Sequence, residues 1–226
     1  MNPQIPSRRR ASLCLCGLAV FFCPPPINAS DSDCIEGNGA KARIERPAPV
    51  ATKIEVGGAF ELRVTCGRAG EIILSGDSNI LPHVHIETIG ETLRIKAARS
   101  ICPKLPVTIE VGVESLVSVQ ADGAGETRIG GLHTSFIAAR ADDAATLALA
   151  GETATLEAVA AGSAMLNARE LKAQRVRASS DGAATLAVVA QESLAAVCRD
   201  AATLLYSGPF NNSQLEANDA CDLQQE

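Results

Sequence analysis

A short segment recurs five times in the second half of the chain, and this repeat constrains the fold more than any other feature. Its copies begin 20, 19, 20 and 18 residues apart, at Gly123–Thr127, Asp143–Leu147, Gly162–Leu166, Gly182–Leu186 and Asp200–Leu204. A unit of about 20 residues is too short to bury a core alone, whereas stacked copies can cover one another. The repeat therefore predicts a solenoid.

Apolar segments between the copies predict β-strands. They lie at Phe136–Ala138, Leu156–Val159, Gln174–Ala178 and Leu194–Val197. Alanine is the best helix former, so helices in the alanine-rich stretches are the alternative. Glycine returns in the units, and threonine and valine occupy positions between the glycines, which favours strands. We expect an all-β parallel β-helix with strands about 4.8 Å apart and small residues stacked at its tight turns.

The first 29 residues have the layout of a secretory signal peptide. Arg8–Arg10 precede an apolar segment over residues 11–23, which Pro24–Pro26 end. This segment is shorter than the roughly 20 residues that a membrane-spanning helix needs. We therefore expect export, cleavage near Ser30 and no membrane span after cleavage.

The rest of the chain divides around a domain predicted over residues 54–210. Alternating segments such as Glu61–Val64 and Val107–Val111 have the period of two expected of strands with one buried face. Residues 30–53 show no period and predict a leader segment before the folded body. Residues 211–226 predict a C-terminal tail or cap.

The net charge argues against two classes of partner. The chain has a formal charge of −6, and loss of the signal peptide with its three arginines takes this charge to −9. An acidic chain without a basic cluster is a poor match for nucleic acid or an anionic membrane surface. Beyond the signal peptide, the aromatic residues that could stack on bases or sugars are few: Phe60, Phe136, Tyr206 and Phe210.

Five cysteines follow the signal peptide, at Cys34, Cys66, Cys102, Cys198 and Cys221. An oxidising compartment favours one or two disulfides, and we expect Cys66 to pair with Cys102 first and Cys34 with Cys221 second. Spacing alone does not fix this connectivity, and the odd number leaves a thiol without an internal partner. None of these cysteines lies in a CxxC pair, which argues against a zinc or redox site.

Seven short motifs between residues 54 and 209 indicate a family. They are Phe60 with Leu62 and Val64, Gly76–Ile80, Gly90–Ile95, Pro106–Ile109, Leu116–Val119, Asp122–Gly125 and Tyr206–Pro209. In order and spacing they resemble the head GIN domain family, also described as auto-transporter adhesin heads. The resemblance implies an exported, right-handed parallel β-helix with no established enzymatic residues. Alanine pairs such as Ala144–Ala145 replace many of the repeated glycine pairs.

Acidic and histidine residues were considered as metal ligands. One turn of successive coils repeats an aspartate that could hold calcium, at Asp122, Asp142, Asp143, Asp181 and Asp200. Aspartate also favours turns by binding nearby backbone amides, which is the interpretation that we prefer. His83 and His85 would share one face of a strand, but no third ligand accompanies them. His133 has no Ser or Cys motif nearby that would predict a catalytic triad.

Basic and threonine residues complete the candidates. A polysaccharide lyase or hydrolase needs clustered carboxylates or a positioned base, and no spacing selects such a set among Arg140, Arg169, Lys172, Arg175, Arg177 and Arg199. Thr146, Thr185 and Thr203 could form a flat face of the kind that binds ordered water, but Glu126 and Met165 interrupt it. We therefore assign no catalytic, cofactor-binding or metal-binding residue.

The expected function is non-enzymatic. We expect a β-solenoid of the cell envelope that acts as a binding, adhesion-like or scaffold module, with no cofactor. Its partner would be an unknown protein or polymer of the envelope, or another copy of the chain, and not nucleic acid. The alternative is a polysaccharide lyase or hydrolase, because such enzymes also use β-helices.

Overall fold

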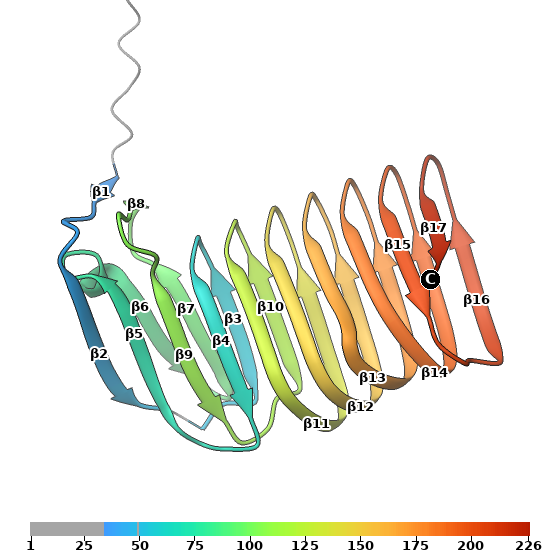
Figure 1. Ribbon diagram of the computed structural model, residues 1–226, viewed down its shortest axis with the longest axis horizontal. Coiled ribbons are helices and arrows are strands. Elements are labelled where there is room, and N and C mark those ends of the chain that lie inside the picture. The colour runs from blue at the N-terminus through green and yellow to red at the C-terminus, as the bar shows by residue number, and fades with distance from the viewer. Residues whose placement is uncertain (1–33, 49) are drawn as a thin grey trace, which may run out of the picture. The chain divides into compact units, whose positions relative to one another are not determined.

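The computed structural model describes residues 34–48 and 50–226, which form an all-β solenoid (Figure 1). The predicted signal peptide, residues 1–29, and the start of the predicted leader lie outside the described residues. The described range contains one 3-10 helix, η1 (Leu81–His83), and no α-helix, so the helical alternative is wrong. No described helix is long and apolar enough to cross a membrane.

The strands fall into a short N-terminal set, a long central set and a short C-terminal set. The first set is β1 (Ile35–Glu36), β2 (Lys41–Pro47), β3 (Lys53–Gly57), β4 (Glu61–Cys66), β5 (Glu71–Asp77), β6 (Val84–Ile89), β7 (Thr92–Ala97), β8 (Ile101–Cys102), β9 (Thr108–Val113) and β10 (Ser118–Asp122). The long strands are β11 (Glu126–Ala141), β12 (Thr146–Ala160), β13 (Met165–Ser180) and β14 (Thr185–Cys198). The last are β15 (Thr203–Ser207), β16 (Asn212–Ala217) and β17 (Asp222–Gln225).

Each long strand forms most of one coil. It runs along one face of the solenoid, bends, and returns along the opposite face (Figure 1). Successive coils pair in parallel, and in β11 and β12 the register shifts at the bend, between Ile129 and Leu132. We call the sheet that contains β4, β15 and β17 the first face, and the sheet that contains β3, β10 and β16 the second face.

Aliphatic side chains stack in columns between the two faces. On the first face the column is Leu147, Leu166, Leu186 and Leu204, and on the second face it is Ile137, Leu156, Val176 and Leu194. All of these residues are buried. Because the register places each one over its neighbour, every coil covers the core of the next.

The repeated segment forms the tight turn that leads from the second face of one coil to the first face of the next. Its first residue has a positive φ in every copy, at Gly123 (91°), Asp143 (60°), Gly162 (74°), Gly182 (76°) and Asp200 (56°). Glycine adopts this left-handed region freely, and aspartate is among the few other residues that enter it. In four of the copies the third residue is a buried alanine, at Ala145, Ala164, Ala184 and Ala202. The repeat length is thus the length of one coil.

The predicted leader, residues 30–53, is not separate from the folded body, because much of it belongs to β-sheets. β2 pairs antiparallel with β5, from Lys41 opposite Asp77 to Pro47 opposite Glu71, and β1 pairs with β8. Only Ala42 and Ile44 of β2 pack against the core. A period of two that spans two apolar residues is too short to be recognised in the sequence.

The N-terminal coils do not stack in the order of the sequence. β3 lies between β7 and β10, and β4 lies between β9 and β11. The chain therefore leaves β4, builds the end of the solenoid with β5 to β9, and returns to stack β10 on β3. The antiparallel strands β2, β5 and β6 close this end.

Asp77 joins three segments at this end of the solenoid. Its buried carboxylate accepts hydrogen bonds from the backbone amides of Gly39 (2.6 Å), Lys104 (2.8 Å) and Leu105 (2.9 Å). The amide of Leu105 contributes most to lowering the pKa of Asp77, and burial opposes this effect. Asn79 adds a hydrogen bond from its side chain to the carbonyl of Glu36 (2.7 Å). The polar residues of the Gly76–Ile80 motif therefore anchor β1 and β2.

The predicted C-terminal tail is the last coil. β16 pairs in parallel with β14, and β17 pairs in parallel with β15. Asp219, Cys221 and Leu223 occupy the positions of Asp200, Ala202 and Leu204 in the preceding coil. The repeat was hidden here because a cysteine and an aspartate replace its alanine and threonine.

Two disulfides fasten the ends of the solenoid, and both predicted pairs are wrong. Cys34 bonds to Cys102 (Cα–Cα 5.7 Å), because β1 beside Cys34 pairs with β8, which contains Cys102. Cys198 at the end of β14 bonds to Cys221 in the last coil (Cα–Cα 5.8 Å). Cys66 is the free cysteine within the described ranges, and burial raises the pKa of its thiol to about 11.

Peptide mapping without reduction should find the pairs Cys34–Cys102 and Cys198–Cys221. The thiol of Cys66 should react slowly with an alkylating reagent at neutral pH, because the thiolate is the reactive form and its raised pKa keeps it scarce. Unfolding should make Cys66 react faster. A Cys66–Cys102 peptide in the native protein would contradict the arrangement of β4 and β8.

Candidate functional site

The aspartates singled out in the sequence follow the tight turns but do not form one site. Asp142 accepts two hydrogen bonds from Arg140 (2.6 and 2.7 Å), and Asp122 accepts two from Gln120 (3.4 and 3.3 Å). Asp143 and Asp200 occupy the positive-φ position of their turns, which agrees with the turn interpretation. No group of three or more His, Cys, Asp or Glu residues in the described part of the chain could hold a metal ion.

Asp181 and Asp200 are neighbours on successive turns. A hydrogen bond between the two side chains raises the pKa of Asp200, and repulsion from Asp181, burial and the charge of Asp219 raise it further. The two carboxylates therefore repel each other when both are ionised, at neutral pH. Sequence reasoning missed Asp219 because its turn departs from the repeat.

The three histidines lie on three different elements. His83 ends η1, and His85 lies on β6 opposite Lys96 of β7. His133 lies at the bend of β11, in register with Glu152 of β12. Glu152 is in turn in register with Lys172 of β13. Glu152 and Lys172 are 3.8 Å apart and, with His133, help to line an open hollow of about 590 Å³.

The threonines predicted as a column lie in one row on the first face. The register runs from Thr146 through Met165 and Thr185 to Thr203. Met165 is 49% exposed and projects from this row. The row is therefore not the flat surface that ordered water would require.

A groove of about 570 Å³ crosses the second face between β11 and β16. The register aligns one residue from each strand, in the order Phe136, Thr155, Arg175, Ser193 and Asn212, which we call the Phe136 row. Two positions further along the strands lies the Glu157 row, which consists of Ala138, Glu157, Arg177, Ala195 and Gln214. Alternate residues of a strand share a face, so both rows point away from the core.

Differences in side-chain size create the groove. Ser193 and Ala195 on β14 are short and form a low floor. Because β14 pairs with both β13 and β16, this floor lies between the two arginines of β13 and the two amides of β16. Phe136 closes the groove at its β11 end. It is 37% exposed, which is high for a phenylalanine.

The two arginines give the groove its charge. Arg177 is 3.0 Å from Glu157, and Arg175 is 3.7 Å from Glu192 and donates a hydrogen bond to Thr155 (3.2 Å). The side chains of Arg175 and Arg177 are nevertheless 54% and 74% exposed. A guanidinium has five N–H donors, so each arginine keeps donors that can reach a ligand.

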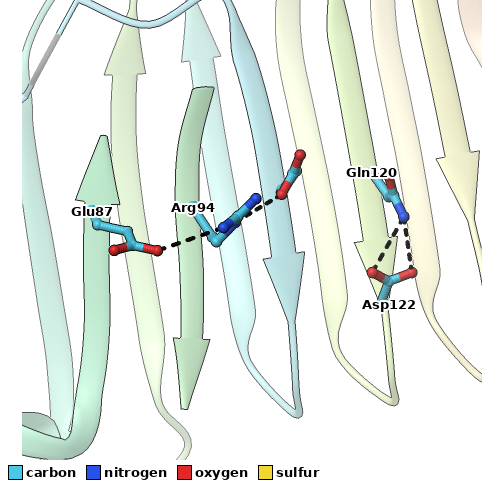
Figure 2. A network of polar contacts seen from close by, with 5 residues as sticks. Glu87, Arg94, Gln120 and Asp122 are labelled. Carbon is cyan, nitrogen blue, oxygen red and sulfur yellow. Dashed lines mark hydrogen bonds and ion pairs between the residues drawn. The ribbon is translucent and has the colours of Figure 1, made fainter. Parts of the chain in front are cut away.

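The N-terminal half of the second face differs from the groove. Figure 2 shows Arg94 turned toward Glu87, and Gln120 turned toward Asp122. Arg94 is 3.7 Å from Glu87 and 2.9 Å from Glu55. Arg94 is only 34% exposed and faces two negative charges. Its donors are thus less available than those of Arg175 and Arg177.

Among the basic residues considered in the sequence, two lie together in the groove. Arg140 pairs with Asp142, Arg169 pairs with Glu226 (2.7 Å), and neither lines the groove. Sequence reasoning named Phe136 among the few aromatic residues but did not connect it with Ser193 or Asn212. The signal was present in the repeat spacing, because residues one coil apart must fall in the same row.

Comparisons with known proteins identify the same architecture. The family model described as "Putative auto-transporter adhesin, head GIN domain" matches residues 52–209. No curated protein matches the chain. The matched range includes the strands β11 to β14 that form most of the groove.

Solved structures share the fold at low sequence identity. A "putative adhesin" from Bacteroides fragilis has a TM-score of 0.66 and 18% identity, over 85% of this chain and 100% of its own. A "putative adhesin" from Parabacteroides merdae has a TM-score of 0.58 and 14% identity, over 86% and 100%. A "putative lipid binding protein" from Parabacteroides distasonis has a TM-score of 0.50 and 16% identity, over 85% and 99%.

Replacing Asp200 by Asn should raise the melting temperature at neutral pH. The raised pKa means that Asp200 favours the fold when it is protonated, and that this contribution is lost as the pH rises through the folded-state value. Asn removes the charge and tolerates the left-handed backbone at φ 56°. The advantage of the variant should shrink below the ordinary aspartate pKa of about 3.9, as thermal melts across this pH range would show.

Asp142→Asn is the matched control, because it removes a carboxylate that pairs with Arg140 and should not raise the melting temperature. A lower melting temperature for Asp200→Asn than for the native protein at neutral pH would contradict the repulsion at this corner.

Proposed function

The chain belongs to the family described as "Putative auto-transporter adhesin, head GIN domain", and on this basis we propose that it is an exported binding module that holds its ligand in the groove of the second face. The observation that supports this most directly is the alignment of Phe136, Arg175 and Asn212 in one row. An exposed ring, guanidinium donors and an amide that converge on one hollow are the components of a polar ligand site.

Export is supported by two features of the chain. The described residues contain two disulfides, and disulfides persist mainly in oxidising compartments. The N-terminal 29 residues have the layout of a signal peptide. The cell envelope supplies both the compartment and the polymers that such a module would bind.

The groove supports binding more than hydrolysis. A glycosidase uses one carboxyl group to protonate the leaving group and a second as base or nucleophile. Glu157 lies beside Arg177 and Glu192 lies beside Arg175. Both are thereby engaged in holding the arginines in place.

The polar lining also favours a polar ligand over an acyl chain. One structure of the same fold is named a "putative lipid binding protein". A lipid tail needs an enclosed apolar cavity. The groove here exposes Arg175, Ser193 and Gln214 and is open to solvent along the face.

Binding to isolated envelope fragments tests the proposal. Replacing Arg175 and Arg177 together by Ala should weaken binding by about tenfold or more, because a hydrogen bond to a charged group contributes about 1.5–3 kcal/mol. Phe136→Ala should also weaken binding. The matched control replaces Arg63 and Arg128 of the first face by Ala, which removes two arginines of similar exposure outside the groove.

Equal loss of binding in the groove variant and the first-face variant would show that charge alone matters. Unchanged binding by the groove variant would show that the ligand lies elsewhere. Either result would contradict the proposal.

A further inference from the structure

The groove crosses the strands, and this direction limits what can lie in it. The Phe136 row spans β11, β12, β13, β14 and β16, which lie side by side in that order. Neighbouring strands are about 4.8 Å apart, so the row is roughly 19 Å long. A ligand that fills the groove is therefore an extended chain parallel to the solenoid axis, and it meets a new side chain about every 4.8 Å.

The spacing of about 4.8 Å between the strands suits a chain of sugars better than a peptide. An extended peptide advances about 3.3 Å per residue and presents alternate side chains to one face at about twice that spacing. Neither distance matches one strand step. One pyranose unit of a linear glycan is close in length to a single strand step of about 4.8 Å.

The central strands of the groove also offer no backbone groups to a peptide. β12, β13 and β14 each pair with a neighbour on both sides, so their amides and carbonyls are already bonded within the sheet. A bound peptide needs such groups for its own backbone, as in strand addition at a sheet edge. A glycan needs side-chain donors and acceptors for its hydroxyl groups, and Ser193, Asn212 and Gln214 provide them.

The position of the arginines indicates where a negative charge would lie. Arg175 and Arg177 are both on β13, at the centre of the groove, so a carboxylate there can accept paired N–H donors from a guanidinium. On either side of Arg175 the Phe136 row is uncharged, with Thr155 toward one end and Ser193 toward the other, whereas in the Glu157 row Arg177 lies between Glu157 and Ala195. Glu157 and Glu192 would repel a ligand with dense negative charge. The lining therefore fits one carboxylate flanked by neutral sugars.

We infer that the ligand is a linear, uronate-containing polysaccharide that lies along the solenoid axis, with one uronate carboxylate on Arg175 and Arg177 and one sugar for each strand. Phe136 packs against the apolar face of the sugar at the β11 end, as aromatic rings do with flat partners. This inference rests on the function proposed above, because it names the ligand class of the same groove.

Calorimetric titration with oligosaccharides of defined length tests the inference. The probes are hyaluronan fragments of two to eight sugars, in which glucuronate alternates with a neutral sugar, and the same fragments with methyl-esterified carboxylates. Affinity should rise with length up to about four or five sugars and then level off, because the row covers four strand steps of about 4.8 Å. Esterification, or replacement of Arg175 and Arg177 by Ala, should lower the affinity about tenfold or more.

Chitin fragments of the same lengths and poly-L-glutamate separate the alternatives. Equal affinity for neutral chitin fragments would overturn the uronate assignment, and tighter binding of poly-L-glutamate would overturn the glycan assignment. Failure of every glycan, together with envelope binding that still depends on Arg175 and Arg177, would overturn this inference and leave the proposed function standing. If replacing Arg175 and Arg177 by Ala left envelope binding unchanged as well, both the inference and the proposed function would be overturned.

Discussion

The structure depends on one constraint, which is that successive coils must stack at backbone contact distance around a tight turn. At this turn the amide of Ser163 donates to the carbonyl of Asp143 (2.6 Å), and the amide of Ala183 donates to the carbonyl of Gly162 (2.7 Å). A Cβ at Gly182 would lie 2.9 Å from the carbonyl oxygen of Gly162. Left-handed backbone is therefore required once in each coil, where glycine or aspartate supplies it, and this requirement produces the sequence repeat.

The same stacking creates the surface on which the proposed function rests. Residues that are 19 or 20 positions apart in the sequence become neighbours, as Phe136, Thr155 and Arg175 do. The inward positions must stay aliphatic because they cover one another, whereas the outward positions are free to vary. A row across the strands can thus acquire an exposed ring, a charge and an amide without any cost to the core. Such a row is long and shallow, which suits a linear polymer more than a small molecule.

The sequence allowed prediction of the coils whose repeated segment is recognisable, but not of the last coil. The small residues at the tight turns, the stacking of the coils and the all-β class followed from the repeat. The N-terminal end could not be predicted, because β3 and β4 are inserted between strands that come later in the chain, and no local pattern records that crossing. The disulfides failed for the same reason, since Cys34 meets Cys102 only through the pairing of β1 with β8. The groove was not predicted because its arginines were grouped by charge, and not by the position that each residue takes in the coil.

The most direct test of this account is to enlarge a buried residue of the tight turn and compare it with an outward residue of the same coils. Ala164→Leu should lower the free energy of unfolding by about 1–3 kcal/mol or more, because the column of small residues between coils has no room for three further carbon atoms. Ala148→Leu on the outer side of the first face should change it little. Equal stability of the two variants in chemical denaturation would contradict the claim that close stacking at the turns holds the solenoid together.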